Sequence, residues 1–258
     1  GDEQLKEIEV TTYRIDEKYS DKRHPDKIVW AMNIEDDLSR RDFTINAIAA
    51  SPEVGELVII DPFSGQSDLD KKIIRAVGNP DERFNEDALR MMRAVRFATI
   101  FGFKIETNTS KAIIKNSSLL KFISKERIRD ELLKIIMTDD ASQGIELLKD
   151  LGLLKFVLPE LEEGFEIDQN KHHIYNCYEH SVRSLAYAAK NKFNKNVRLA
   201  ALLHDIGKPR AKQGEGESAT FYNHEIIGAK MAFQALNRLR FPKKDIEKIV
   251  RLVRYHLF

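Results

Sequence analysis

The sequence contains 258 residues, of which 42% are hydrophobic and 32% charged, with a formal net charge of +1. This length allows one large or two modest domains, and the balanced charge excludes a uniformly basic nucleic-acid binder, although basic residues can still gather on one face. There is no apolar run of about 18 residues and no signal peptide, and the single cysteine allows no internal disulfide, so we expect a soluble cytoplasmic protein without a membrane partner.

Residues 1–80 are predicted to form short strands separated by turns. Side chains alternate with a period of two over residues 8–14, and residues 28–32 and 57–60 are further short apolar runs that suit a sheet. The charged stretch at 16–27 is expected to be an exposed loop, and residues 61–69 indicate a tight turn.

Four polar residues lie close together in the sequence: Arg40, Arg41, Asp42 and Asn46. Two guanidinium groups, a carboxylate and an amide can together hold a phosphate and a ribose hydroxyl. The alternative is a capped turn that leads into a short buried helix, and the residues alone leave both open. The glycine-rich patterns of phosphate loops and dinucleotide-binding turns are absent from the sequence.

A helix is predicted over residues 86–96, with Asn85 as its N-cap. The apolar residues that would dock it on a core are Ala88, Met91, Met92, Val95 and Ala98. Steps of three residues give the opposite face one polar stripe, formed by Asp87, Arg90, Arg93 and Arg96.

This polar stripe has two interpretations. A carboxylate accepts hydrogen bonds and a guanidinium donates them, so Asp87 beside Arg90 matches the amino group and neighbouring acceptor on the edge of cytosine or adenine. Arg93 and Arg96 would then face the triphosphate of the same nucleotide. The alternative is a salt bridge on a solvated helix, worth roughly 0.3–0.5 kcal/mol.

Three further helices are predicted, over residues 110–116, 124–137 and 140–151. The last has Asp140 and Gln143 in the spacing of a capping box and Gly152 at its end. Residues 159–164, a proline followed by an acidic run and a glycine, indicate a boundary between two parts of the chain.

The C-terminal part is predicted to be helical and carries four of the seven histidines, one of them next to an aspartate: His180, His204 with Asp205, His224 and His256. Neutral imidazole and carboxylate are good ligands for divalent transition metals, and an aspartate can bridge two ions. The alternative for each histidine is a packed core residue with satisfied hydrogen bonds. The pairing of His204 with Asp205 favours the metal hypothesis.

Several motifs occur in the order and spacing of a known family. They are Arg40-Arg41-Asp42-Phe43-Thr44-Ile45-Asn46-Ala47, Asp61-Pro62-Phe63 with Gly65 and Asp68-Leu69, Glu86-Asp87-Ala88-Leu89-Arg90 with Arg93 and Arg96, and Ser124-Lys125-Glu126-Arg127-Ile128-Arg129. With these motifs the chain resembles the bacterial class II tRNA nucleotidyltransferases and poly(A) polymerases. From about His172 onward it is similar to the HD metal-dependent phosphohydrolase domain that is fused to many members.

The resemblance implies an α+β fold class, with a partial nucleotidyltransferase head of mixed β-sheet and helices, an elongated all-α neck and body, and an all-α HD domain. We expect the head over residues 1–80, the helical nucleotide-reading neck over 81–158 and the HD-type domain over 159–258. The first part of the head and the end of the HD domain are expected to lie beyond this sequence.

The implied activity is the addition of CMP or AMP, from CTP or ATP, to the 3′ end of tRNA without a nucleic-acid template. By resemblance, Asp87 and Arg90 read the base, Arg41 contacts the phosphates and Asp42 the ribose. The rest of the implied nucleotide site is Asn46, with Arg93 and Arg96 on the triphosphate side. The tRNA 3′-hydroxyl attacks the α-phosphate, while two Mg²⁺ ions stabilise the attacking and leaving oxygens.

The catalytic Asp-x-Asp pair of the family is not identified in this sequence. Asp68-Leu69-Asp70 has the letters but belongs to the turn after Asp61-Pro62, and Glu9 is the one accessory carboxylate that we consider.

Three alternatives to a CCA-adding enzyme remain open. They are an HD phosphohydrolase whose first half is a binding platform, a poly(A) polymerase, and a non-catalytic RNA-binding remnant. The close pairing of Asp87 with Arg90 favours nucleotide transfer, because a binding platform would not need it. The shared motifs do not separate CCA addition from CC addition, A addition or poly(A) synthesis.

Overall fold

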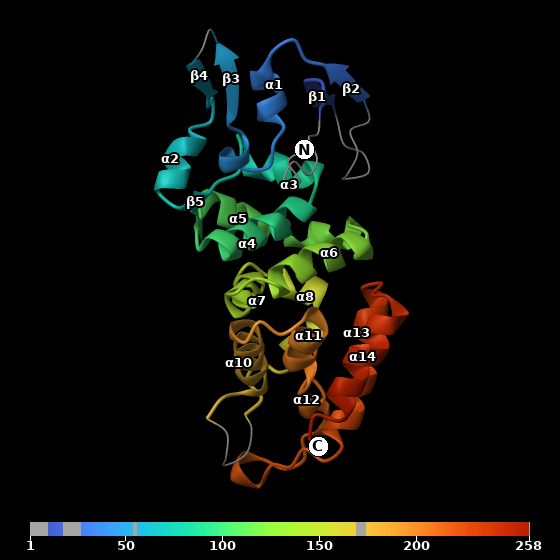
Figure 1. Cartoon of the computed structure of the whole chain (residues 1–258). Helices are drawn as coiled ribbons and strands as arrows, with labels where there is room; N and C mark the ends of the chain where they lie inside the picture. The colour runs from blue at the N-terminus through green and yellow to red at the C-terminus, as the bar shows by residue number, and fades with distance from the viewer. Residues whose placement is uncertain (1–9, 18–26, 54–55, 169–173, 258) are drawn as a thin grey trace, which may run out of the picture.

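The computed structural model describes residues 10–17, 27–53, 56–168 and 174–257. The molecule is elongated, with the strands and first helices at one end and the C-terminal helices at the other (Figure 1). Short strands occupy the first part and helices the rest, so the predicted α+β class is confirmed. None of the helices in the described ranges has the length and apolar character needed to cross a bilayer.

The described strands pair in twos. The elements of the first part are β1 (Arg14–Glu17), β2 (Lys27–Trp30), α1 (Ile34–Ser39), the 3-10 helix η1 (Thr44–Asn46), β3 (Ala49–Glu53), β4 (Glu56–Ile60), α2 (Gly65–Asp70) and β5 (Ile73–Ile74). β1 pairs with β2 and β3 with β4, both antiparallel, while β5 pairs in parallel with a later strand, β6 (Lys104–Ile105).

The strand predicted over residues 8–14 is wrong over residues 10–13, and of its described residues only the last, Arg14, lies in a strand. β1 begins at Arg14 and runs to Glu17, where a loop was expected, because these residues pair with Trp30 and Lys27 of β2. Residues 8 and 9 lie outside the described residues. Pairing with a partner strand, rather than alternation alone, decides where a strand forms.

The helices between the two ends are α3 (Pro80–Glu86), α4 (Leu89–Phe101), α5 (Thr107–Asn116), the 3-10 helix η2 (Ser117–Phe122), α6 (Lys125–Ile136), α7 (Ala141–Asp150), α8 (Leu154–Val157) and α9 (Pro159–Glu162). The C-terminal elements are α10 (Cys177–Lys190), α11 (Lys195–Leu203), α12 (Lys208–Ala211), the 3-10 helix η3 (Gly216–Ser218), α13 (His224–Arg238) and α14 (Lys243–Arg254). The three helices predicted after residue 100 are therefore confirmed as α5, α6 and α7. The capping box predicted for α7 is wrong, because the Asp140 side chain makes no capping hydrogen bond.

The helix predicted over residues 86–96 is confirmed from Leu89 onward, but its predicted start is wrong, because the helix is interrupted at Asp87. α3 ends at Glu86, Asp87 has extended backbone angles, and α4 starts at Leu89. Asn85 does not cap a helix; its amide donates to the carbonyl of Asp81 at 2.9 Å. Asp87 instead accepts a hydrogen bond from the backbone N–H of Leu89 at 3.1 Å, as aspartates do at helix starts.

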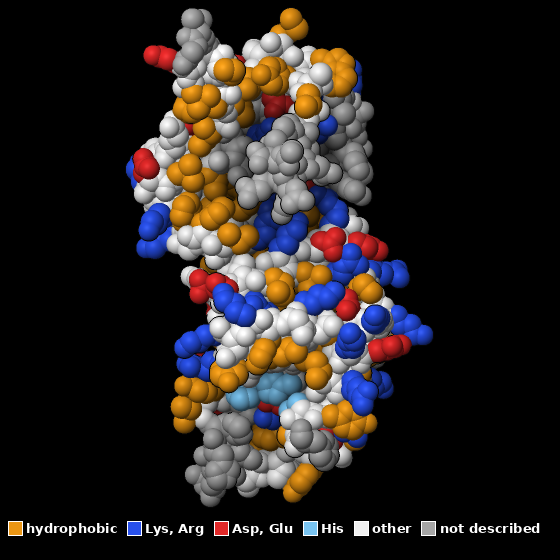
Figure 2. Space-filling model, viewed as in Figure 1, with side chains coloured by type: hydrophobic (Ala, Val, Ile, Leu, Met, Phe, Trp, Pro, Cys, Tyr) orange, Lys and Arg blue, Asp and Glu red, His pale blue; other side chains and the backbone are white. Residues whose placement is uncertain are grey.

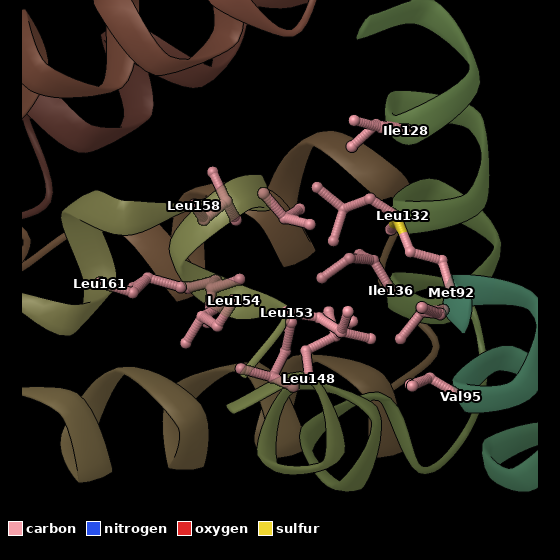
Figure 3. Packing of buried hydrophobic residues seen from close by; sticks show 14 of the residues in the cluster. Met92, Val95, Ile128, Leu132, Ile136, Leu148, Leu153, Leu154, Leu158 and Leu161 are labelled. Carbon is pink, nitrogen blue, oxygen red and sulfur yellow. The ribbon is translucent and has the colours of Figure 1, made fainter. Parts of the chain in front are cut away.

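Buried side chains form one large cluster that extends from the first part of the chain to α14. The apolar face predicted for α4 is confirmed, and Figure 3 shows Met92 of α4 beside Leu132 of α6. α7 comes so close to this layer that a Cβ atom on Gly144 would lie 2.3 Å from Cγ2 of Ile135. The core therefore continues from α4 and α6 into the C-terminal helices.

Arg198 of α11 is 2% exposed and ties three helices together. Its guanidinium donates to the carbonyl oxygens of Phe193 at 2.8 Å, Ala189 at 3.3 Å, Ile136 at 3.0 Å and Thr138 at 2.6 Å. Ile136 ends α6 and Ala189 lies in the last turn of α10, so the cation faces the negative ends of two helix dipoles. These hydrogen bonds fix α6, α10 and α11 relative to one another.

We expect Arg198→Met to lower the free energy of unfolding by about 3–5 kcal/mol, because it leaves buried carbonyl oxygens without donors. Urea unfolding followed by far-UV circular dichroism measures the change. Arg198→Lys keeps the charge and part of the hydrogen bonding, so it should be less destabilised. An unfolding midpoint of Arg198→Met equal to that of the wild type would contradict this role.

Candidate functional site

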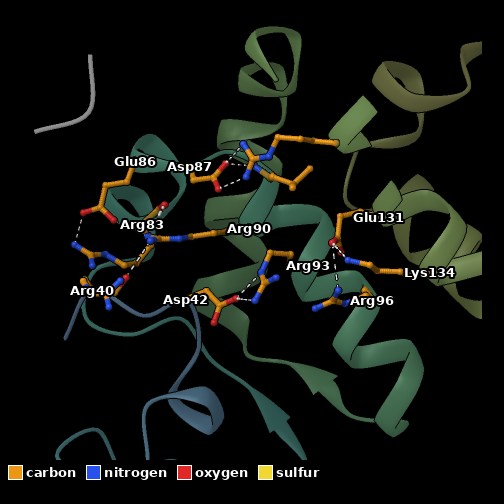
Figure 4. Close-up of polar contacts among 12 residues, drawn as sticks. Arg40, Asp42, Arg83, Glu86, Asp87, Arg90, Arg93, Arg96, Glu131 and Lys134 are labelled. Atoms are coloured by element: carbon orange, nitrogen blue, oxygen red, sulfur yellow. Dashed lines mark hydrogen bonds and ion pairs between the residues drawn. The ribbon is translucent and has the colours of Figure 1, made fainter. Parts of the chain in front are cut away.

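A cavity of about 460 Å³ lies where α4 and α6 meet the chain around η1. Its lining residues are Arg40, Arg41, Asp42, Asn46, Asp87, Leu89, Arg90, Arg93, Phe97 and Arg127. Six of the seven residues predicted to bind a nucleotide therefore line one cavity, although they come from separate stretches of chain. Figure 4 shows how the arginines and carboxylates of this region face one another.

Asp42 is held from three sides. One carboxylate oxygen accepts hydrogen bonds from the backbone N–H of Phe43 at 2.9 Å and the amide of Asn46 at 3.0 Å. The other accepts from Nε of Arg93 at 2.6 Å. Asp42 is buried while Arg93 remains one-third exposed, so the ion pair leaves part of the arginine facing the cavity.

Asp87 and Arg90 both line the cavity. The predicted stripe placed these two side chains next to each other, but they do not pair. Asp87 accepts two hydrogen bonds from Arg127 of α6, at 3.2 and 2.7 Å. Arg90 instead donates to Glu86 at 2.5 Å and to the carbonyl oxygen of Arg40 at 2.9 Å. The break between α3 and α4 explains the difference, because Asp87 lies outside the helix that carries Arg90.

Arg96 does not line this cavity, which corrects its place in the predicted stripe. An α-helix turns about 100° per residue, so six residues leave Arg96 about 120° around the axis from Arg90. It is buried against Glu131 of α6 at 3.2 Å, with its guanidinium 4.3 Å from the ring centre of Phe97. Burial lowers the pKa of Arg96, and the charge of Glu131 opposes that shift.

Arg40, which the sequence grouped with Arg41, Asp42 and Asn46, also lines this cavity. Sequence reasoning missed the part of Arg127. This residue lies in a motif that carries the family resemblance, but its contact with Asp87 across forty residues has no local sequence signal. Glu9, the candidate accessory carboxylate, lies outside the described residues. The buried Asp68 carboxylate accepts hydrogen bonds from the Thr44 hydroxyl at 2.7 Å and from Nε of Arg75 at 3.0 Å. These contacts fit its exclusion from the catalytic pair.

The second group of predicted residues surrounds Asp205, which is 2% exposed. Nε2 atoms of His204 and His180 lie 3.1 and 3.4 Å from one of its carboxylate oxygens, and those of His224 and His256 lie 3.4 and 3.6 Å from the other. These four histidines and Asp205 are called the histidine cluster below. The five residues predicted as metal ligands thus lie in two groups of possible ligands that share Asp205, one with His180 and His204 and the other with His224 and His256.

The hydrogen bonds of the imidazoles orient their lone pairs toward the centre of the histidine cluster. Nδ1 of His204, His224 and His256 lies 2.7–2.8 Å from the carbonyl oxygen of the third residue before it. A proton on each Nδ1 leaves Nε2 as an acceptor, as in the metal-ligating histidines of proteins.

One of the two Asp205 carboxylate oxygens faces no lysine or arginine among the described residues. One Asp205 carboxylate oxygen is buried without a hydrogen-bond partner. Burial by itself would raise the pKa of Asp205, but the surrounding histidines lower it, so the carboxyl is ionised. Imidazole lone pairs around an ionised carboxylate fit a divalent metal ion.

Lys208 is a further residue that sequence reasoning missed. Its ammonium lies 2.8 Å from the Asp205 oxygen that faces His204, and it is buried. The cluster and Lys208 line a cleft of about 500 Å³ together with Phe221 and Tyr222. Lys208 lies three residues after Asp205, a spacing that brings two side chains together on a helical turn. No other feature of the sequence indicated that its side chain would lie beside the histidine cluster.

Three known domain families match the chain in order. Residues 2–75 match the poly(A) polymerase head domain, residues 102–165 the probable RNA- and SrmB-binding site of polymerase A, and residues 177–258 the HD domain.

Curated relatives and solved structures agree with these matches. The A-adding tRNA nucleotidyltransferase of Deinococcus radiodurans is 39% identical over 87% of this chain and 53% of that protein. The CCA-adding enzyme of Geobacillus thermodenitrificans is 49% identical over 60% of this chain and 37% of that enzyme. The chain thus spans about half the length of these relatives or less.

Among solved structures, the Bacillus stearothermophilus CCA-adding enzyme in complex with CTP matches with a TM-score of 0.58 and 27% identity, over 95% of this chain and 59% of that chain. A CCA-adding enzyme in apo form II, 24% identical, matches with a TM-score of 0.63 over 94% of this chain and 51% of that chain, which shows the fold. The chain therefore belongs to the family of tRNA nucleotidyltransferases and poly(A) polymerases.

Proposed function

We propose that this chain is the part of a tRNA nucleotidyltransferase that selects and holds CTP or ATP for addition to a tRNA 3′ end. The observation that carries this proposal is the 460 Å³ cavity, in which a hydrogen-bonding edge, formed by Asp87 and Arg90, stands beside further arginines. The matched relatives that are named CCA-adding and A-adding enzymes support it.

Base selection would rest on hydrogen-bonding capacity that the protein has not used. An aspartate offers about four acceptor positions, and Asp87 uses three, for Leu89 and Arg127. Arg90 has about five N–H donors, and its contacts to Arg83, Glu86 and Arg40 leave Nε without a contact in the described residues. An acceptor and a donor on the same wall suit the edge of cytosine or adenine.

The triphosphate would lie against the cationic side of the cavity. Arg41 is 43% exposed at its side chain, and Arg93 is 33% exposed, although each also touches a carboxylate. Asp42 and Asn46 lie beside them and suit the ribose. We assign Arg96 no direct contact, because its guanidinium packs on Glu131 outside the cavity.

The two carboxylates of this cavity do not fit a Mg²⁺ site, because Arg93 and Arg127 already occupy them. These residues therefore bind and orient the nucleotide, and the ions of the transfer reaction would need other ligands. The tRNA 3′-hydroxyl attacks the α-phosphorus and pyrophosphate leaves, so the task of this wall is to keep the α-phosphorus in line.

The histidine cluster supports a second candidate function, a metal-dependent phosphohydrolase. The cluster would hold divalent transition metal in the two ligand groups that share Asp205, one with His180 and His204 and the other with His224 and His256. Such an ion supplies an activated water and withdraws charge from a phosphoryl oxygen. Lys208 beside Asp205 would contribute positive charge for a phosphate entering the cleft.

We also propose that residues 1–80, 81–158 and 159–258 form the head, the neck and the HD-type domain. The expected cytoplasmic location agrees with tRNA and nucleoside triphosphates as substrates.

Asp87→Ala should remove preference among nucleotides, because it deletes the acceptor for the base amino group. We expect the ratio of CTP and ATP affinity to GTP and UTP affinity to fall at least about tenfold. Isothermal titration of this chain with each of the four nucleotides measures the ratio. Asp81→Ala, an aspartate outside the cavity, is the matched control, and unchanged discrimination in Asp87→Ala rejects the base-reading role.

His204→Ala should remove most of the bound transition metal, since it deletes one ligand of the cluster. Elemental analysis after dialysis against zinc or manganese gives the stoichiometry, and CTP affinity should remain that of the wild type. Tyr222→Ala, in the same cleft but without a ligand atom in the cluster, should keep its metal. Equal metal content in His204→Ala and wild type would identify the cluster as structural.

A further inference from the structure

A second opening leads to the histidine cluster from another side. A cavity of about 1120 Å³ lies between α10, α11 and α14 and is called the α10–α14 groove here. Its lining includes His204 and His256, which also line the cleft that contains Asp205. In Figure 2 the histidines are visible at the surface, bordered by hydrophobic side chains. A ligand bound in the α10–α14 groove can therefore contact the histidine cluster.

Three aromatic side chains of the groove are open to solvent. Tyr187 of α10 is 66% exposed, Phe193 in the following turn 43%, and Tyr255 after α14 55%. When a flat ring stacks on an aromatic side chain that is this exposed, the apolar surface of the side chain is removed from water. Nucleic-acid bases stack on aromatic side chains with little sequence preference, because every base has a π-face.

The groove also has a positive charge bias. None of its lining residues is acidic, whereas Lys195, Lys248 and Arg251 are basic. Lys195 pairs with Asp245, but Lys248 and Arg251 have no carboxylate within 4.0 Å among the described residues. Cations without partners beside exposed aromatics match a chain of phosphates and bases better than they match an apolar peptide or a membrane surface.

We propose that the α10–α14 groove binds the terminal nucleotides of a single-stranded RNA, with the 3′ end directed toward His204 and His256. The inference rests on the proposed function, which supplies an RNA 3′ end as the molecule that this protein handles. It assigns the groove as the RNA-binding side of the histidine cluster.

Fluorescence anisotropy with a labelled RNA pentamer that ends in a 3′-phosphate tests the stacking part of the proposal. Tyr187→Ala should weaken binding about tenfold, the typical effect of losing one base stack. Phe233→Ala removes an aromatic ring of α13 that is 53% exposed and lies outside the groove, so its affinity should equal that of the wild type. Equal affinities of Tyr187→Ala and wild type, or equal losses in both variants, would overturn the proposal.

The salt dependence tests the phosphate contacts. Arg251→Gln should reduce the slope of log affinity against log salt by about 0.7, the value for one phosphate contact on a single strand. A slope equal to that of the wild type would mean that Arg251 faces no phosphate, and the proposed position of the strand would fail.

Crosslinking locates the 3′ end directly. A pentamer with a 3′-terminal 4-thiouridine, irradiated on the full chain, should attach to peptides within residues 177–204 or 243–257. Attachment confined to residues 102–165, or a loss of binding in Tyr222→Ala but not in Tyr187→Ala, would place the end elsewhere.

Nucleotide discrimination separates this inference from the proposed function. If Asp87→Ala loses discrimination while Tyr187→Ala leaves RNA affinity unchanged, the inference fails and the proposed function stands. If Tyr187→Ala weakens RNA binding while Asp87→Ala changes nothing, the groove binds RNA and the base-reading cavity fails.

Discussion

The position of both candidate sites depends on the buried cation of Arg198. Its guanidinium binds the carbonyl end of α6, and its own helix, α11, leads directly to His204. Near its start α6 carries Arg127, which reaches the nucleotide cavity and holds Asp87. A buried arginine without a carboxylate is tolerable because four carbonyl oxygens and two helix dipoles replace its water. Arg198 thus fixes the relative positions of the helices that carry residues of the two sites.

The two sites have opposite electrostatic designs. In the candidate nucleotide cavity the carboxylates of Asp42 and Asp87 are each neutralised by an arginine, and other guanidinium groups line the wall. This arrangement attracts a polyanion such as a triphosphate. In the histidine cluster one ionised carboxylate is surrounded by imidazoles that act as acceptors when neutral. That arrangement attracts a cation, so the same fold offers an anion site and a cation site.

The parts of the structure that could be predicted are those set by local pattern. The buried face of α4, the extents of α5 to α7, and the gathering of the histidines around Asp205 followed from periodicity, helix signals and family motifs. The interruption of the helix at Asp87 was missed because the residues on both sides of it continue the same helical periodicity. A better signal was Asn79-Pro80, which starts α3 with a capping asparagine and a proline in the first turn.

The misplaced features share a dependence on distant partners. β1 lies where β2 can pair with it, Asp87 turns to Arg127 on another helix, and Arg96 turns to Glu131. Arg96 also shows how repeated steps of three drift around a helix: the first step stays on one face, but the second leaves it. Local spacing identifies a polar face, while the partner that a charge selects depends on the packing of the whole chain.

Cys177 gives the molecule a practical property. It is the only cysteine of the sequence, it is 2% exposed, and burial raises the pKa of its thiol to about 11. Because the thiolate is the reactive form, this residue is nearly inert toward maleimides and other alkylating reagents at neutral pH. Two cysteines introduced on the surface, one at each end of the molecule, would therefore carry spin labels or fluorophores selectively while the native residue stays in place. Distances between the two ends of the molecule then become measurable in solution without first rebuilding the core.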